Sequence, residues 1–197
     1  MSVKPRRLDY VAETREALLD AAEDLFIRDG FAATSIDAIS AQARFTKGAV
    51  YRHYADKQAL FTAVFERVEV EAMDRLQQLR NSPDASTHAA DALANFLDMC
   101  GEPRFQRIVL EEGPAVFGWR RWRELDQHYT AAMLEGILTE LMDGGHIVRR
   151  PVKPLARLCC ALIAEAAIII SEAENHATAR ASLLETVHAI LRGLSQQ

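Results

Sequence analysis

The chain has 197 residues, 49% of them hydrophobic, which suffices for a small unit and a second helical body but excludes two large domains. Its six prolines and nine glycines leave long stretches unbroken, and this favours helices over a turn-rich β fold. The formal net charge is −5. That balance argues against a nucleic-acid partner only if the charges are spread evenly, and they are not.

Positive charge gathers in two short segments near the N-terminus. Residues 1–57 carry nine Lys/Arg against nine Asp/Glu, so the whole acidic excess lies in residues 58–197. Residues 44–57 contain four basic side chains and a single acid, and the first seven residues contain three basic side chains and no acid. These clusters predict either a phosphate-binding surface or an ordinary solvated basic face, and charge alone does not choose between them.

The cysteines and the hydrophobic stretches indicate a cellular location. Cys100, Cys159 and Cys160 are odd in number and two are adjacent, which is typical of a reducing compartment rather than a disulfide framework. The first residues lack an apolar run of signal-peptide type. The most hydrophobic stretch, residues 158–170, is shorter than the roughly 20 residues that cross a bilayer. The sequence therefore predicts a soluble cytoplasmic protein without a membrane partner.

The spacing of apolar residues predicts an all-α fold of about nine helices, with no convincing strand. A first amphipathic helix is expected over residues 11–29, and Gly30 stands where a helix-ending glycine belongs. Ser35 is a typical N-cap for a short second helix over residues 36–43.

Two further caps follow along the chain. Thr46 begins a third helix over residues 47–54, and Asp56 caps a long fourth helix that runs to about residue 80. Glycines and prolines then separate the remaining predicted helices, which cover residues 86–100, 103–112, 119–143, 153–174 and 177–194.

Short helices joined by four-residue connections describe a helix-turn-helix unit, whose second helix needs a slim, basic tip to enter the major groove. The N-cap at Thr46 leaves backbone N–H groups free at a positive dipole end. Two of the residues that follow have almost no side chain, two are basic, and two can donate to phosphates. They are Gly48 and Ala49, Lys47 and Arg52, and Tyr51 and His53.

Residues 14–60 resemble the N-terminal domain of the TetR family of transcriptional regulators. The resemblance is a long ordered pattern rather than one short motif. The matching residues are Thr14-Arg15, Ala22, Leu25-Phe26, Gly30-Phe31, Thr34-Ser35, Ile39, Thr46-Lys47-Gly48-Ala49-Val50-Tyr51, His53-Tyr54, Lys57 and Leu60. It implies an N-terminal arm and three-helix helix-turn-helix domain over residues 1–57, a connecting fourth helix over 58–80, and a ligand-binding and dimerisation domain over 81–197.

The resemblance also implies roles for individual residues. Phosphates of double-stranded DNA would be held by Thr34, Ser35, Thr46, Tyr51 and Lys57. Bases or their neighbourhood would be faced by Lys47, Gly48, Ala49, Arg52 and His53. Val50 and Tyr54 would pack inside the unit.

The chain departs from the family pattern in the turn between the second and third helices. The family usually carries a glycine there, whereas this chain has Arg44. If Arg44 adopts a positive φ, the conformation costs on the order of 1 kcal/mol. Its guanidinium then either adds a phosphate contact or lies free in solvent, and the sequence leaves both readings open.

The last two predicted helices carry apolar faces that predict a homodimer. The first is apolar nearly all round and the second repeats apolar residues at a/d-like spacing, as in an intersubunit four-helix bundle. The expected interface residues are Leu158, Leu162, Ile169, Leu183, Val187, Ile190, Leu191 and Leu194. Burial within one subunit is the alternative. Dimerisation fits the predicted function because a two-fold pair reads a palindrome.

The middle helices are rich in bulky residues, and the resemblance implies a small-molecule pocket between the fourth helix and its neighbours. The expected lining residues are Phe96, Met99, Phe105, Val109, Phe117, Trp119, Trp122 and Tyr129. The candidate polar anchors are Arg104, Arg107, Glu111, Glu112, Arg123 and His128. Ordinary core packing is the alternative for each of them, and the sequence does not identify the effector.

Together these features predict a repressor that leaves its operator when a small, largely apolar ligand binds. No enzymatic activity, cofactor or metal site is expected, because catalytic motifs and metal-ligand spacings are missing from the sequence. Two alternatives remain: redox sensing through Cys159 or Cys160, and a DNA-positioning or nucleoid-associated member of the same family that has no inducer.

Overall fold

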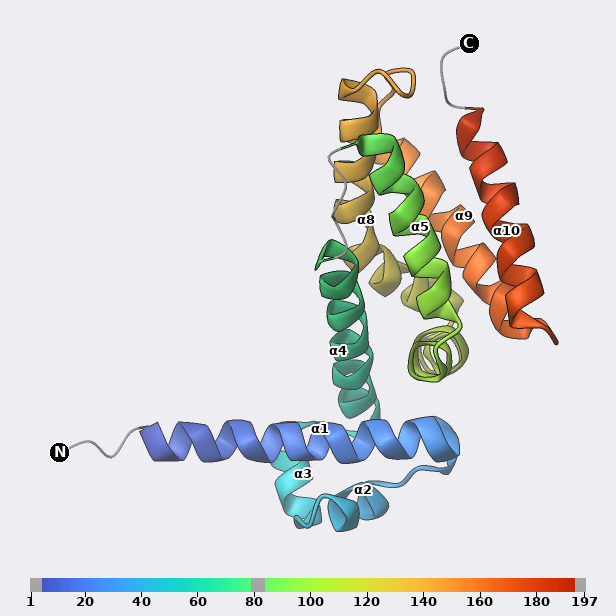
Figure 1. The fold of residues 1–197 in the computed structure, drawn as a ribbon. Helices are drawn as coiled ribbons and strands as arrows, with labels where there is room; N and C mark the ends of the chain where they lie inside the picture. Colours follow the sequence, from blue (N-terminus) through green and yellow to red (C-terminus); the bar gives the residue numbers. More distant parts are fainter. Residues whose placement is uncertain (1–4, 79–83, 194–197) are drawn as a thin grey trace.

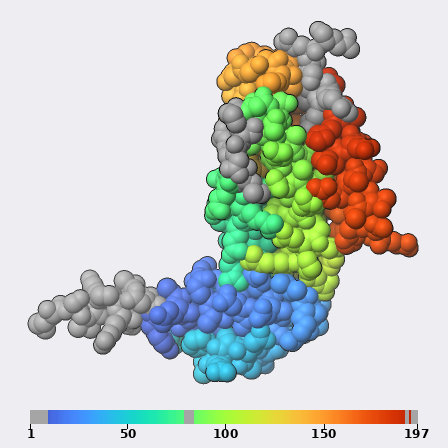
Figure 2. Space-filling model, viewed as in Figure 1, coloured from blue at the N-terminus to red at the C-terminus, as the bar shows by residue number. Residues whose placement is uncertain are grey.

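The computed structural model describes residues 5–78 and 84–193, and within them every regular element is helical. An upright helical body stands on a flat N-terminal unit, in which α1 lies across the foot of the body and α2 and α3 pack on its far side (Figure 1). Figure 2 shows this elongated shape.

The N-terminal unit comprises α1 (Pro5–Ala33), α2 (Ile36–Gln42) and α3 (Lys47–His53). The body comprises α4 (Lys57–Gln78), α5 (Ala85–Cys100), α6 (Pro103–Phe105), the π-helix η1 (Gln106–Glu112), α7 (Gly113–Phe117), α8 (Trp119–Asp143), α9 (Val152–Glu172) and α10 (His176–Arg192).

The predicted N-caps of the short helices are confirmed. The Ser35 hydroxyl accepts a hydrogen bond from the Ala38 N–H at 3.1 Å, and the Thr46 hydroxyl accepts one from the Ala49 N–H at 3.2 Å. The Asp56 carboxylate likewise accepts from a backbone N–H in the first turn of α4, at 2.7 Å. Each cap satisfies a backbone donor that has no partner inside its own helix, and so fixes where the helix begins.

The first helix is longer than the predicted range of residues 11–29. It begins at Pro5 and reaches Ala33, with non-helical dihedral angles at Gly30 (φ 81°, ψ 165°). A Cβ on Gly30 would lie 2.6 Å from Oε1 of Glu112 and 2.7 Å from Nη2 of Arg107. Gly30 therefore both bends the chain and allows side chains of η1 to approach α1 closely.

The segment after α5 also differs from prediction. A single helix over residues 103–112 was expected to end at Gly113, but α6, η1 and α7 follow one another and the turn lies at Gly118, whose φ is 75°. Gly113 has another function, because a Cβ there would lie 2.8 Å from the Trp122 ring. Trp122 is fully buried, and its indole N–H donates to the carbonyl of Val109 at 2.8 Å.

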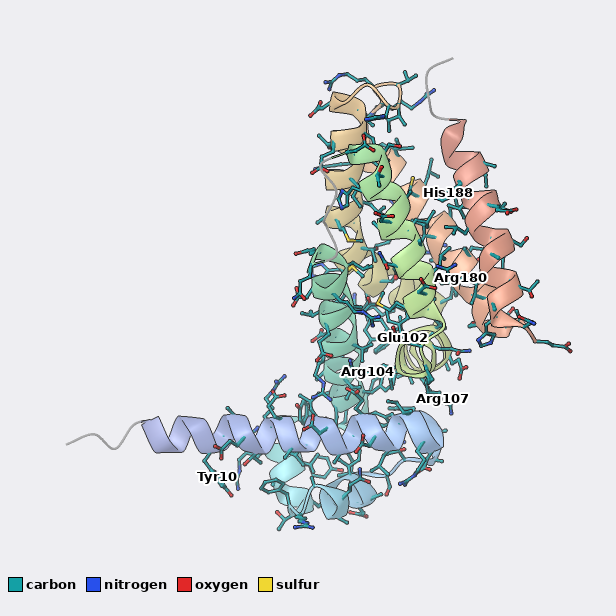
Figure 3. The ribbon with its side chains drawn as sticks, in the orientation of Figure 1. Tyr10, Glu102, Arg104, Arg107, Arg180 and His188 are labelled. Atoms are coloured by element: carbon teal, nitrogen blue, oxygen red, sulfur yellow. The ribbon has the colours of Figure 1, made fainter. Side chains whose placement is uncertain are left out.

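An ionic cluster joins the N-terminal unit to the body. Glu23 of α1 receives the guanidinium of Arg67 from α4 at 2.6 Å and that of Arg104 from α6 at 2.5 Å. Arg104 also pairs with Glu71 at 2.5 Å, and lies at the junction between body and α1 in Figure 3. Burial by itself would raise the pKa of Glu23, but the hydrogen bonds from both arginines outweigh it and lower that pKa.

Within the body, α8 and α9 pack closely, and α9 also contacts α5, α10 and η1. On the outer side of the body, Arg180 of α10 forms an ion pair with Asp98 of α5 and donates a hydrogen bond to the Ala94 carbonyl at 3.3 Å. By length and composition alone α9 is long and apolar enough to cross a membrane, which is weak evidence because the core helix of a soluble protein passes the same test.

The turn between α2 and α3 confirms the backbone conformation considered for Arg44. Its φ is 59°, the one positive value among the non-glycine residues of the described ranges. The turn is held by hydrogen bonds from the Arg44 N–H to the Ala41 carbonyl at 3.1 Å and from the Phe45 N–H to the Ser40 carbonyl at 2.9 Å. A left-handed arginine is strained by its Cβ.

Replacing Arg44 with glycine is expected to raise the free energy of unfolding by up to about 1 kcal/mol, because glycine takes this conformation without strain. Urea denaturation measures the change. The matched control is Arg28→Gly in the regular part of α1, which is expected to lose roughly 1 kcal/mol. Equal losses in the two variants would show that Arg44 stores no conformational strain.

Candidate functional site

The outward side of α2 and α3 forms a polar surface at the end of the molecule opposite the body, which we call the recognition face (Figure 1). It consists of Ser35, Arg44, Thr46, Lys47, Gly48, Ala49, Tyr51, Arg52 and His53. Tyr51 is 50% exposed although it is a large aromatic residue, and Arg52 beside it is also exposed. Val50 and Tyr54 are buried, which confirms their predicted packing role and orients the other side of α3 outward.

Gly48 lies on the open side of this face. A Cβ at this position would meet nothing nearer than the Thr46 hydroxyl, at 3.8 Å. No contact within the chain therefore requires glycine here, in contrast to Gly30 and Gly113. The missing side chain leaves the α3 backbone accessible from outside, as a close approach to another molecule would need.

Lys47 is paired within the chain, a feature that sequence reasoning missed. Its ammonium lies 3.0 Å from a carboxylate oxygen of Asp37 on α2, and both side chains are more than half exposed. The hydrogen bond and charge of Asp37 raise the pKa of Lys47. Asp37 therefore lies beside Lys47 on the recognition face, although residues 46–54 themselves contain no acidic residue. Only the packing of α2 on α3 reveals this neighbour.

Thr34 and Lys57, two of the expected phosphate ligands, are engaged elsewhere. Thr34 is buried, and its hydroxyl donates to the carbonyls of Gly30 at 2.8 Å and Leu25 at 3.2 Å. The Lys57 ammonium donates to the carbonyls of Phe31 and Thr34, each at 2.7 Å, and lies 4.3 Å from the centre of the Phe31 ring. The Thr34 hydroxyl thus bonds to the end of α1, and Lys57 joins that end to the start of α4. A phosphate contact by either side chain stays a prediction.

The body contains a cavity of about 90 Å³ between α5, α8 and α9, which we call the body cavity. Its wall is almost entirely apolar, with Phe96, Met133 and Ile163 among its lining residues. Asp126 and Thr130 of α8 supply its oxygen-bearing side chains. The volume is several times the roughly 10–15 Å³ that one water molecule needs.

Of the expected lining residues, Phe96 alone lines this cavity. Met99, Phe105, Val109 and Trp122 are buried in the main core instead. The remaining three lie outside the cavity wall: Phe117 packs on Phe61 and Phe65, Trp119 is exposed, and Tyr129 is partly buried beside His128. Large aromatic side chains fill space, and the cavity lies where alanines and smaller apolar residues leave room.

The expected polar anchors also lie elsewhere. Arg104 belongs to the ionic cluster at the junction, and Arg107 pairs with Glu111 at 2.6 Å and Glu112 at 3.1 Å beside α1. Figure 3 shows Arg107 near the foot of the body. Of the other two, the Arg123 guanidinium lies 5.4 Å from the centre of the Trp119 ring, and His128 is exposed. None of the six lines the body cavity.

Two carboxyl groups of the body core have no hydrogen bond or ion pair with the residues that the structure describes. Asp126 is 7% exposed, and burial raises its pKa to about 6 although the charge of Arg123 acts in the opposite direction. Glu69 of α4 is fully buried, and neither of its carboxyl oxygens has a hydrogen-bond partner in the described part of the chain. Burial and the neighbouring Asp126 raise the pKa of Glu69 well above its usual value.

The three thiols are buried, and burial raises the pKa of each. Cys160 lies 3.5 Å from the Thr130 hydroxyl, on the cavity wall. In the ranges 5–78 and 84–193, no cluster of three or more His, Cys, Asp or Glu side chains is placed to hold a metal ion.

The outer side of α9 and α10 exposes apolar side chains, which we call the bundle face. Leu158 is 69% exposed, Ile169 and Ile190 are also exposed, and Leu162 and Leu183 are half-buried. Val187 differs from expectation, because it is 1% exposed and belongs to the core of its own subunit. The side chain of Leu191 and all of Leu194 lie outside the described residues.

Comparison with known proteins gives two family matches. The family described as bacterial regulatory proteins, tetR family, matches residues 18–64, and the family described as tetracyclin repressor-like, C-terminal domain, matches residues 87–194. The HTH-type transcriptional regulator AcrR of Shigella flexneri is 42% identical over 101 residues, which span 50% of this chain and 47% of AcrR.

Solved structures match most of this chain. A TetR-family transcriptional regulator from Pectobacterium atrosepticum is 32% identical, has a TM-score of 0.85, and is matched over 96% of this chain and 97% of its own. The fold also resembles that of FadR from Bacillus subtilis in complex with stearoyl-CoA, with a TM-score of 0.68, 18% identity and coverage of 87% and 96%. The chain therefore belongs to the TetR family of DNA-binding transcriptional regulators.

Proposed function

We propose that this protein is a cytoplasmic homodimeric repressor, which binds a palindromic operator through the recognition face and leaves it when a small, largely apolar effector occupies the body cavity. Residues 1–57 would form the DNA-binding domain, 58–80 the connection, and 81–197 the regulatory and dimerisation domain. The observation that carries the proposal is the open side of α3 at Gly48, where glycine serves no packing inside the chain.

DNA contact would use the exposed members of the recognition face. Tyr51 and Arg52 extend from α3 into solvent, and Arg44 adds an exposed cation at the preceding turn. Lys47 would exchange its surface ion pair with Asp37 for a phosphate or a base edge. That exchange is inexpensive because exposed pairs contribute about 0–1 kcal/mol. Ser35 and Thr46 would offer their helix-capping ends to phosphates.

Dimerisation would bury the bundle face. Leu158, Leu162 and Ile169 follow a helical stripe along α9, and Ile190 continues the apolar surface on α10. Exposed side chains of this size, gathered on adjacent helices, are typical of an association surface. A two-fold pair of these helices would form the four-helix interface that places two α3 helices on one side of the dimer.

Effector binding would reach the DNA-binding domain through η1. Phe96 of the cavity wall contacts Phe105 of α6, with ring centres 6.1 Å apart. The chain continues directly into η1, whose Arg107 and Glu112 lie against Gly30 of α1. A ligand that prefers a shifted α5 would therefore tilt α1 and alter the spacing of the two α3 helices. That the fold can hold a ligand is supported by FadR of Bacillus subtilis, solved in complex with stearoyl-CoA.

Lys47→Ala is expected to weaken operator binding and to lower the slope of log affinity against log salt by about 0.9, the value for one lost phosphate contact. Mobility-shift titrations at several salt concentrations measure both effects. Lys153→Ala, which removes an exposed lysine from α9, is the matched control and should leave the slope unchanged. An operator affinity and a salt slope that are both unaltered in Lys47→Ala would contradict a contact between Lys47 and the operator.

Gly48→Ala is expected to separate folding from binding. Alanine in place of glycine stabilises a helix by roughly 0.5–1 kcal/mol, and the space around the new methyl is open. The thermal midpoint should therefore rise while operator affinity falls, because the methyl obstructs the approach of the duplex. A control is Gly136→Ala in α8, where a Cβ also meets nothing within 4 Å: it should stabilise without affecting affinity. Full operator affinity in Gly48→Ala would place the duplex elsewhere.

Leu158→Glu is expected to convert the dimer to monomer at micromolar concentrations, because it places a charge in the centre of the apolar bundle face. Sedimentation equilibrium measures the change, and the far-ultraviolet circular dichroism should stay helical. The matched control is Val70→Glu, an exposed apolar residue of α4 away from this face. A Leu158→Glu protein that remains dimeric would remove α9 from the interface.

A further inference from the structure

We propose that the effector of the body cavity is an organic cation, whose positively charged head pairs with Asp126 and whose apolar remainder fills the space between α5, α8 and α9. The proposal rests on the proposed function, since it takes the body cavity to be the effector site. It adds the charge of the effector, which neither the fold nor the apolar character of the wall specifies.

The first support is the position of Asp126. Its side chain lines the cavity and is 7% exposed, yet no hydrogen bond or ion pair reaches its carboxylate from any described side chain. The cation that acts on it, Arg123 of the same helix, is directed toward the Trp119 ring, 5.4 Å from the ring centre. A buried carboxylate without a partner is costly, and a bound cation would remove that cost.

The second support is Glu69, which lies deeper in the same core. It is fully buried and its carboxyl oxygens have no hydrogen-bond partner in the described residues. Asp126 is near enough to influence its ionisation. Glu69 therefore brings no positive charge to Asp126, and no described side chain neutralises the cavity's carboxylate by a hydrogen bond or an ion pair. The negative charge of Asp126 favours a cation and opposes a carboxylate or phosphate ligand.

The third support is the composition of the remaining wall. Phe96, Met133 and Ile163 offer apolar contact, while Thr130 and Cys160 already face each other at 3.5 Å. A neutral ligand would gain hydrophobic contact but leave Asp126 unpaired. A cation with an apolar body would satisfy both parts of the site, as small-molecule sites with few polar groups generally do.

A second hollow adjoins the cavity and could admit such a ligand. It shares Met133 and Ile137 with the cavity wall and opens between α4, α5 and α8. Its own polar residues include His88 and Glu140, whose nearest ionisable atoms are 3.4 Å apart. A carboxylate at this position would attract a cation toward the cavity.

The test uses three probes with the same eight-carbon chain and different charges: n-octylammonium, 1-octanol and octanoate. Isothermal titration calorimetry of the full chain at about pH 7.5 should give the order ammonium, octanol, octanoate, from tightest to weakest. In Asp126→Asn the ammonium should bind at least about 30-fold more weakly, because one partner of a buried charge pair is removed. The octanol affinity should change little.

The matched control is Asp91→Asn, the same chemical change on an exposed part of α5 that does not line the cavity. All three affinities should stay as in the unmodified chain. Asp126→Asn should fold, since it removes an unpaired buried charge, and its thermal midpoint at about pH 7.5 should not fall. Glu69→Gln offers a second variant, which keeps Asp126 and should therefore retain the preference for ammonium over octanoate.

The ammonium should also lose affinity in acid. Since the pKa of Asp126 is about 6, the carboxylate is largely ionised at pH 7.5 and largely protonated at pH 5, and binding should weaken about tenfold between them. The groups that face it are Glu69 from α4, Cys100 from α5, Arg123 on α8 and Cys160 from α9. Burial raises the pKa of Glu69 and of both thiols, which favours their neutral forms. The loss of affinity in acid is therefore assigned to Asp126 and should be missing in Asp126→Asn. Octanol should show no such dependence.

The outcomes separate this inference from the proposed function. Ammonium binding that depends on Asp126 supports the inference, whether or not the operator is released in a parallel mobility-shift assay. If the ammonium binds without releasing the operator, the effector role of the cavity fails while its preference for a cation stands. If octanol or octanoate binds as tightly as the ammonium, or if Asp126→Asn leaves the ammonium affinity unchanged, the inference is overturned.

Discussion

The arrangement of the whole molecule depends on the carboxylate of Glu23, which receives guanidinium groups from two different parts of the body. Arg67 comes from α4, the long helix that leaves the N-terminal unit, and Arg104 comes from the short helix α6. A partly buried arginine–carboxylate pair of this kind fixes the relative orientation of two helices as well as the distance between them, because the guanidinium fork is rigid. Side chains of both α1 and the body thus define the angle between them. A shift of one would therefore change the position of the other.

Because the N-terminal unit is small, its polar residues divide between those that hold the fold together and those that face outward. Backbone carbonyls at the α1–α4 junction accept hydrogen bonds from Thr34, which is buried, and from Lys57, which is partly buried. The side chains that point outward make few contacts within the chain. The main contact is the exposed ion pair of Lys47 with Asp37. Arg44, the one non-glycine residue with a positive φ in the described ranges, lies on the same surface. A small domain can therefore remain firmly folded while most of its polar surface stays free to meet a partner.

Much of this fold can be predicted from sequence, and the failures have physical causes. Capping residues and apolar spacing act locally, so the starts of α2, α3 and α4 followed from Ser35, Thr46 and Asp56. The cavity could not be placed, because a void depends on how distant helices fit and bulky residues mark filled space rather than empty space. Gly113 was assigned to a helix end by the same local logic, whereas it makes room for Trp122 from another helix. Likewise, the hydrogen bonds from Lys57 to the carbonyls of Phe31 and Thr34 join residues far apart in the chain, and local spacing does not predict them.

The burial of all three thiols has a practical consequence. Because each sulfhydryl is enclosed and burial holds its pKa above the usual range, the unmodified chain presents little thiolate to a maleimide or iodoacetamide reagent in neutral solution. A single cysteine introduced on the surface, for example at Arg52, would then be labelled selectively. Fluorophores or spin labels attached there would report the distance between the two recognition faces of the proposed dimer. No native cysteine has to be removed first.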